Sequence, residues 1–113
     1  MLAACNMAAS SVGTTGVTSA TLSPGAGKTA NLAGFVVCAR ATAAAAIAVT
    51  VTGCIGGTLN FDIGVAAAPA ETIFPLVFDL PLCGSAPGQD ITVSLAAVGA
   101  GGVTAVTAWG VKE

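Results

Sequence analysis

The stretch from residue 47 to residue 65, IAVTVTGCIGGTLNFDIGV, constrains the fold more than any other part of the chain. Apolar residues alternate with small or polar ones on both sides of a glycine-rich interruption, as in two strands joined by a tight loop. With the loop at residues 53–57, three apolar pairs face each other: Val51 and Leu59, Val49 and Phe61, and Ile47 and Ile63. A shift of one residue would mix the apolar and polar faces, so the pattern predicts both a β-hairpin and its register.

The opposite side of this hairpin pairs Thr50 with Asn60 and Ala48 with Asp62. Its residues are small or polar, and Asp62 is the one ionised group among them. Because a surface with so little charge can contact another protein as well as solvent, we treat it as a candidate contact surface for a second chain.

Five further stretches are rich in alternating, β-branched or aromatic residues, and we expect each to form a strand: residues 17–22, 32–40, 72–82, 91–95 and 103–111. Proline, glycine and polar residues separate them. Pro75 and Pro81 each remove a backbone donor, so their strand should lie at a sheet edge or a bulge. The last two strands are expected to form a second hairpin with its tip within residues 96–102.

About seven or eight short strands predict an all-β fold, a single antiparallel two-sheet sandwich of jelly-roll type. Residues 17–113 form this domain, and residues 1–16, which carry no charge and no sustained period, are expected to form a flexible N-terminal arm. The last strand is apolar on both sides and should be buried in the core or against a neighbouring subunit. The candidate core residues are Val49, Val51, Leu59, Phe61, Ile63, Leu76, Phe78, Leu80, Val93 and Trp109.

Charged residues make up only 7% of the 113 residues, whereas hydrophobic residues make up 55%. So few charges indicate that other chains cover part of the exterior. Three cations provide no basic patch, so nucleic-acid binding is not expected. Residues 41–61 and 91–111 are uncharged and long enough to span a bilayer, but their central glycine pairs and two-residue alternation favour strands over membrane helices.

The four cysteines, Cys5, Cys38, Cys54 and Cys83, include no C-x-x-C pair, and the chain has no histidine. A structural zinc site is therefore not expected, and buried or half-buried thiols are the default. Disulfide bonds are the alternative in an oxidising environment. Cys54 and Cys83 lie at strand ends, where cross-links are common, and Cys5 in the arm could reach a neighbouring chain.

No set of residues indicates catalysis. The carboxylates Asp62, Glu71, Asp79, Asp90 and Glu113 are widely separated, and the absence of histidine and tyrosine leaves no nucleophile and base to pair. Residues 23–29, SPGAGKT, resemble a phosphate-binding loop, but Leu22 stands where glycine is required and a strand follows in place of a helix. We expect no catalytic residue, no metal, no cofactor and no enzymatic activity.

Five segments carry a resemblance to a known family: GFVVCA (34–39), IAVTVTGCIGGTLNF (47–61), FPLVFDLPL (74–82), SAPGQDITVSL (85–95) and VGAGG with TAWG (98–102 and 107–110). Their series of strands and turns resembles the small β-sandwich decoration (cement) and head-surface proteins of tailed bacteriophages. The chain departs from them in its four cysteines and alanine-rich leader. The resemblance implies a homotrimer that binds the major capsid protein on the outer surface of a phage head, assembled in the bacterial host cytoplasm.

Two other roles remain open. A head fibre or host- or carbohydrate-binding module would use aromatic residues and carboxylates in a loop cluster, for which Trp109 is the available tryptophan. A bacterial surface protein would be processed at Cys5, since Leu2-Ala3-Ala4-Cys5 resembles a lipobox, although no apolar stretch precedes it.

Overall fold

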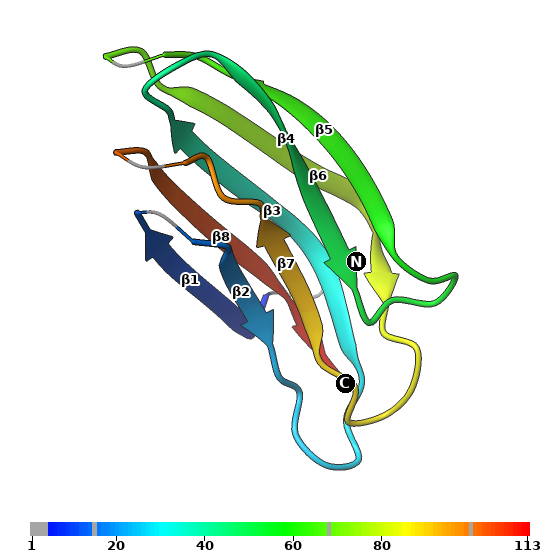
Figure 1. The fold of residues 1–113 in the computed structure, drawn as a ribbon. Coiled ribbons are helices and arrows are strands. Elements are labelled where there is room, and N and C mark those ends of the chain that lie inside the picture. Colours follow the sequence, from blue (N-terminus) through cyan, green and yellow to red (C-terminus); the bar gives the residue numbers. More distant parts are fainter. Residues whose placement is uncertain (1–4, 15, 68, 100) are drawn as a thin grey trace.

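The computed structural model describes residues 5–14, 16–67, 69–99 and 101–113, and its regular elements are eight β-strands (Figure 1). The strands are β1 (Met7–Gly13), β2 (Thr18–Leu22), β3 (Ala30–Arg40), β4 (Ala45–Thr52), β5 (Leu59–Val65), β6 (Thr72–Cys83), β7 (Ile91–Leu95) and β8 (Val103–Lys112). The described residues contain no helix that is long and apolar enough to cross a membrane.

The strands form two four-stranded antiparallel sheets, ordered β1-β8-β3-β6 and β2-β7-β4-β5, which pack against each other (Figure 1). Consecutive strands alternate between the sheets, except for β4 and β5. This order is the strand order of a jelly roll. The predicted all-β, two-sheet sandwich is confirmed.

The hairpin of β4 and β5 has the predicted register, with Val51 opposite Leu59, Val49 opposite Phe61 and Ile47 opposite Ile63. Its valines are fully buried between the sheets. Alternation with one buried face is what sets this register, because any slip would expose the valines. Gly53 opens the loop with a φ of +94°, a left-handed conformation that favours glycine.

Phe35 of β3 lies at the centre of the core, fully buried. Its ring centroid lies 6.0 Å from that of Phe61, 6.2 Å from that of Phe74 and 6.3 Å from that of Phe78, with tilted ring planes. The cluster joins β3 and β6 of one sheet to β5 of the other. Tilted rings at these separations contribute beyond their buried area, so the cluster helps to fix how the sheets pack.

The expected second hairpin does not form. β7 pairs with β2 and β4, whereas β8 pairs with β1 and β3, so residues 96–102 carry the chain from one sheet to the other. Two alternating strands joined by a glycine-rich loop look the same in sequence whether they pair with each other or with strands of different sheets. Among the described strands, β4 and β5 are the one consecutive pair that is hydrogen-bonded.

The expected N-terminal arm is in part a strand. Residues 7–13 form β1, which pairs with β8 from Met7 opposite Gly110 to Gly13 opposite Thr104. The side chain of Asn6 fastens its start, because Nδ2 donates to the carbonyl of Lys112 and Oδ1 accepts from its N–H. β1 therefore pairs with the edge of β8, a strand far away in the chain that the sequence around residues 7–13 does not indicate. Residues 1–4, including most of the lipobox-like motif, and residue 15 lie outside the described residues.

β6 is an edge strand, as its two prolines predict, and its pairing with β3 is interrupted. Leu32 lies opposite Leu82, but Gly34 lies opposite Val77, so the four residues 78–81 face the single residue Ala33. This irregularity breaks the alternation of β6. Leu80, predicted to lie in the core, is instead 81% exposed for this reason.

Trp109 is a second correction to the predicted core. β8 turns Thr104, Val106 and Ala108 into the sandwich, and Trp109, one position further, points to the other face of its sheet and is half-buried there. The other predicted core residues are buried or pack against the buried cluster: Val49, Val51, Leu59, Phe61, Ile63, Leu76, Phe78 and Val93.

Candidate contact face and groove

The outer face of the β1-β8-β3-β6 sheet carries no charge over three rows of paired residues, and we call these twelve positions the apolar face. The rows are Val12, Ala105, Cys38 and Ile73; Ser10, Thr107, Val36 and Pro75; and Ala8, Trp109, Gly34 and Val77. Two of the twelve, Ser10 and Thr107, are polar.

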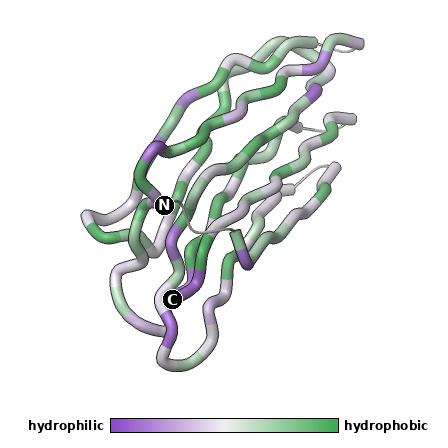
Figure 2. The backbone as a smooth tube through the Cα atoms, turned by 180° about the vertical axis from the view of Figure 1, so that it is seen from behind, coloured by the Kyte–Doolittle hydropathy of each residue, from purple (hydrophilic) through white to green (hydrophobic). Residues whose placement is uncertain are grey.

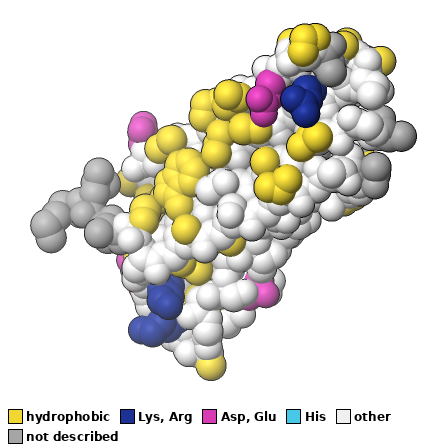
Figure 3. Space-filling model, turned by 90° about the vertical axis from the view of Figure 1, so that its left-hand side faces the viewer, with side chains coloured by type: hydrophobic (Ala, Val, Ile, Leu, Met, Phe, Trp, Pro, Cys, Tyr) yellow, Lys and Arg dark blue, Asp and Glu magenta, His cyan; other side chains and the backbone are white. Residues whose placement is uncertain are grey.

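Large side chains of the apolar face are open to solvent: Val12 is 73%, Ile73 62% and Val77 67% exposed. Figure 2 shows that strongly hydrophilic residues are sparse along the strands, and Figure 3 shows a band of hydrophobic side chains with lysine or arginine beyond both ends. A contiguous exposed apolar surface of this kind is typical of a binding interface.

The outer face of the other sheet is polar. Hydroxyl groups pair across its strands, with 2.8 Å between the Oγ atoms of Ser19 and Ser94 and 3.1 Å between the Oγ1 atoms of Thr21 and Thr92. The polar side of the hairpin, with Thr50 and the exposed Asp62, belongs to this face. The sequence-based contact surface therefore lies opposite the face on which the structure gathers apolar residues.

A signal for the apolar face was present in the sequence of β6. Ile73, Pro75 and Val77 alternate with Phe74, Leu76 and Phe78, so both sides of the strand are apolar. The two phenylalanines pack against the core, whereas Ile73 and Val77 are exposed on the outer face. A strand that is apolar on both sides is expected to be buried on both sides. The core of this chain buries one side of β6, so burial of the other side requires a second molecule.

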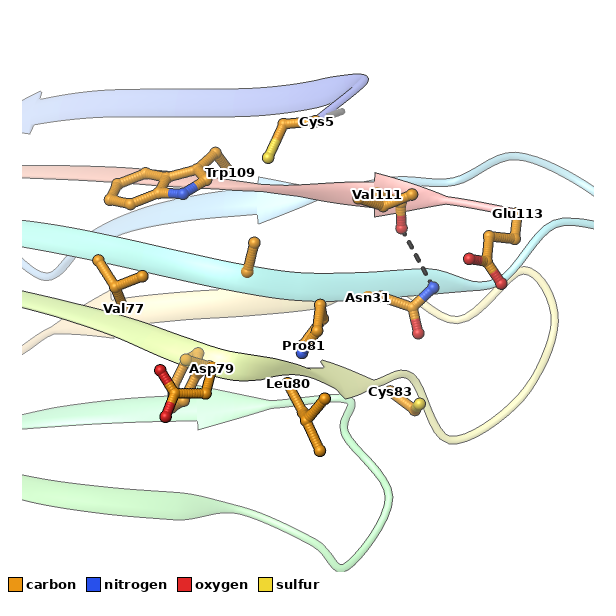
Figure 4. Close-up of a pocket in the computed structure, with 12 residues that line it drawn as sticks. Cys5, Asn31, Val77, Asp79, Leu80, Pro81, Cys83, Trp109, Val111 and Glu113 are labelled. Carbon is orange, nitrogen blue, oxygen red and sulfur yellow. Dashed lines mark hydrogen bonds between the residues drawn. The ribbon is translucent and has the colours of Figure 1, made fainter. Parts of the chain in front are cut away.

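An open groove of about 850 Å³ lies at the end of the apolar face, next to the interruption between β3 and β6 (Figure 4). Trp109 and Val77 of the apolar face line it, together with Leu80, Pro81, Val111 and other apolar residues. Asp79 and Glu113 contribute carboxylates, and the described residues that line the groove include no lysine or arginine. Sequence inspection missed the groove because the irregular pairing of β6 creates it.

The Trp109 indole lies against the backbone of β3 at Gly34. A Cβ atom at Gly34 would be 2.7 Å from Cζ2 of Trp109 and 2.8 Å from the carbonyl oxygen of Leu76. Because glycine leaves this space empty, the indole can lie close to the backbone at Gly34, and Trp109 also lines the groove (Figure 4).

Asn31 is the buried polar residue of the groove, 9% exposed. Its Nδ2 donates to the carbonyl of Val111 at 3.2 Å and to that of Thr29 at 3.5 Å. These two acceptors fix the orientation of the amide, and Oδ1 points away from Val111, towards the Cys83 side of the groove (Figure 4). Within the described part of the chain, Oδ1 accepts no hydrogen bond.

All four cysteines are free thiols in this structure. Burial, and to a lesser degree the charge of Cys83, raises the pKa of Cys54 above its ordinary value. Cys54 pairs with Gly84 in an isolated antiparallel bridge, so the adjacent Cys83 projects to the opposite side, exposed where Cys54 is buried. The two thiols are not bonded to each other in this structure.

Cys38 lies on the apolar face, and Cys5 and Cys83 line the groove. Burial, and then the negative charge of Glu71, raises the pKa of Cys38, which keeps its thiol protonated at neutral pH. A protonated thiol behaves as a small apolar group, so Cys38 adds to the apolar character of the face.

The described residues contain no group of three or more histidine, cysteine, aspartate or glutamate side chains placed to hold a metal. Residues 23–29, the segment that resembles a phosphate-binding loop, connect β2 to β3. A strand follows them, so the helix N-terminus that binds phosphate in such loops is not formed here.

No family model matches the chain, and no curated protein matches it. A solved structure of the virus-like particle of the extra small virus of the giant freshwater prawn Macrobrachium rosenbergii is similar over 96% of this chain and 81% of that chain. The identity is 14% and the TM-score 0.39. So distant a likeness carries no functional inference, which must come from the surface of this chain.

Proposed function

We propose that the chain is a structural virion protein, a decoration (cement) protein that binds the major capsid protein on the outer surface of a phage head and stabilises the shell. The observation that carries the proposal is the uncharged apolar face on one sheet of a jelly roll. This architecture serves viral capsid proteins and lectins. Such a role needs contact area and no active site, and the proposal includes no catalytic activity.

The size of the apolar face sets the scale of the contact. Four strands about 4.8 Å apart and three rows about 6.6 Å apart cover roughly 400 Å². A stable interface buries about 800 Å² on each partner. The footprint must therefore extend beyond the twelve positions, and the groove that adjoins Trp109 and Val77 is the next apolar surface available.

We further propose a homotrimer as the bound form, because symmetric self-association would place several apolar faces on the shell at once. Multiple linked contacts raise the overall affinity without enlarging any one footprint. Light scattering on the purified protein measures this directly, and three times the chain's mass is the expected result.

A second candidate function is a carbohydrate- or host-binding head module. The structure favours it in one respect, because Trp109, Asp79 and Glu113 line one groove. Aromatic rings and carboxylates are the groups such a site would use. The apolar face has no role in this alternative, which is why we rank it second.

The test is sedimentation of the protein with phage heads assembled without it from the cognate major capsid protein. Wild type is expected to sediment with the heads, and Ile73→Asp, which charges the apolar face, should weaken binding at least tenfold. Ile55→Asp is the matched control, because Ile55 is 69% exposed in the loop between β4 and β5. Failure of wild type to bind, or equal binding of both variants, would contradict the proposal.

A further inference from the structure

Most of the side-chain oxygen and nitrogen atoms in the described lining of the groove are hydrogen-bond acceptors. Asp79 and Glu113 contribute carboxylates, and Asn31 contributes its free Oδ1. Among the described lining residues, the indole of Trp109 and the amide of Asn31 carry the side-chain N–H groups, and the Asn31 nitrogen is already engaged. An occupant therefore has to bring donors, and preferably a positive charge.

The Oδ1 atom of Asn31 is a third acceptor of the groove, separate from the two carboxylates. No side-chain polar atom sealed from solvent lacks a hydrogen-bond partner among the described residues, so this oxygen is accessible at the groove surface. Neighbouring carbonyls hold the Asn31 nitrogen, so the amide cannot turn to hide its oxygen without losing those bonds. The oxygen is thus presented to the groove (Figure 4).

The other lining residues suit a side chain whose aliphatic part carries the donor group at its end. Val77, Leu80, Pro81 and Val111 are apolar, and the indole of Trp109 lines the same groove. The face of an indole ring attracts cations, and arginine more often than lysine makes such contacts. A guanidinium group offers five N–H donors in one plane and can stack on the ring while bonding a carboxylate.

We propose that the groove binds an arginine side chain on an apolar, extended segment of the capsid protein, an occupant that rests on the function proposed above. The guanidinium lies on Trp109 and donates to Asp79, and the neighbouring apolar residues continue onto the apolar face. The groove thereby supplies both the missing contact area and a specific anchor.

The experiment uses the lone tryptophan of the chain as its reporter, since Trp109 lies in the groove. Purified protein is titrated with the peptide N-acetyl-Val-Arg-Val-amide while Trp109 fluorescence is recorded. The matched peptide carries citrulline, which keeps the shape of arginine without its charge. We expect a saturable change with the arginine peptide and at least tenfold weaker binding of the citrulline peptide.

Asp79→Asn should weaken binding of the arginine peptide about tenfold. Asp62→Asn, on the polar face of the other sheet, removes an equal charge and should leave binding unchanged. Equal responses to the two peptides, no response to either, or a response to chitotriose in place of the arginine peptide would overturn the inference; the last result would support the carbohydrate-binding alternative.

Failure of this inference is distinguishable from failure of the proposed function. The sedimentation assay needs no peptide. If wild type and Asp79→Asn bind heads equally well, the arginine anchor is wrong and the decoration role stands. If wild type binds the arginine peptide but no heads, the cation site stands and its assignment to a capsid partner is wrong.

Discussion

Trp109 of β8 and Gly34 of β3 are cross-strand neighbours, and the indole ring occupies the space that a side chain at position 34 would fill. Gly34 is also buried beneath the ring. The missing Cβ atom thus determines how the one tryptophan lies on the apolar face and how it forms a wall of the groove.

Gly34→Ala should destabilise the fold by about 1–3 kcal/mol, because the new methyl group meets the ring and the Leu76 carbonyl at once. Trp109 fluorescence should change with it, since the ring has to move. Gly64→Ala is the control, because a Cβ there has no heavy atom within 4 Å. Urea unfolding compares the two, and equal stability of both variants would show that the close approach is not structural.

The two sheets are also joined by a buried hydrogen bond between the hydroxyls of Thr18 of β2 and Thr104 of β8. Thr104→Val should cost about 1–3 kcal/mol, because it leaves the Thr18 hydroxyl buried without this partner. The double variant Thr18→Val/Thr104→Val should cost less than the sum of the single changes. A double-mutant cycle by urea unfolding measures the coupling, and additive costs would argue against the bond.

The exposure of Leu80 predicts a contrast between two leucines. Leu80→Ala should change the free energy of unfolding by no more than about 0.5 kcal/mol, as expected for an exposed residue. Leu95→Ala, at a fully buried position of β7, should cost about 2–5 kcal/mol. Comparable costs at both sites, measured by thermal unfolding, would place Leu80 in the core after all.

The raised pKa of Cys54 predicts a loss of stability in alkaline solution. Below its ordinary value of 9.0 the thiol is protonated in both states, and no pH dependence arises from it. As the pH rises past 9.0, the unfolded chain loses this proton first, so the free energy of unfolding falls until the folded thiol also ionises. The stability difference between wild type and Cys54→Ala should therefore narrow above pH 9, and parallel curves from pH 7 to 10.5 would contradict the assignment.

The register of β4 and β5 could be predicted from sequence because both strands are local and each has one apolar side. The pairing of β8 with β1 and β3 could not, because its partners lie far away in the chain and its own alternation is the same in either arrangement. Leu80 was misplaced because it lies among the four residues, 78–81, that leave the regular pairing opposite Ala33, although Phe78 and Leu82 on either side of it pack against the core. No period in the sequence marks that position.

The apolar face and the groove could likewise be predicted only in part from the sequence. The low charge of the sequence predicts that other chains cover part of the exterior. It could not locate the apolar face, which depends on which sides of β3, β6 and β8 pack into the core. The groove depends on the same irregularity that exposes Leu80 and brings Asp79 to the end of the face occupied by Trp109. Long-range pairing, and not local propensity, assembles both surfaces.

We propose that the chain joins a virion through the apolar face of the β1-β8-β3-β6 sheet. Electron cryomicroscopy of phage heads saturated with the protein would show which sheet contacts the shell. We expect Val12, Ile73 and Val77 to be buried against the shell or a neighbouring copy of the chain. A reconstruction in which that sheet faces solvent, with the polar sheet of β2, β7, β4 and β5 against the capsid, would contradict it.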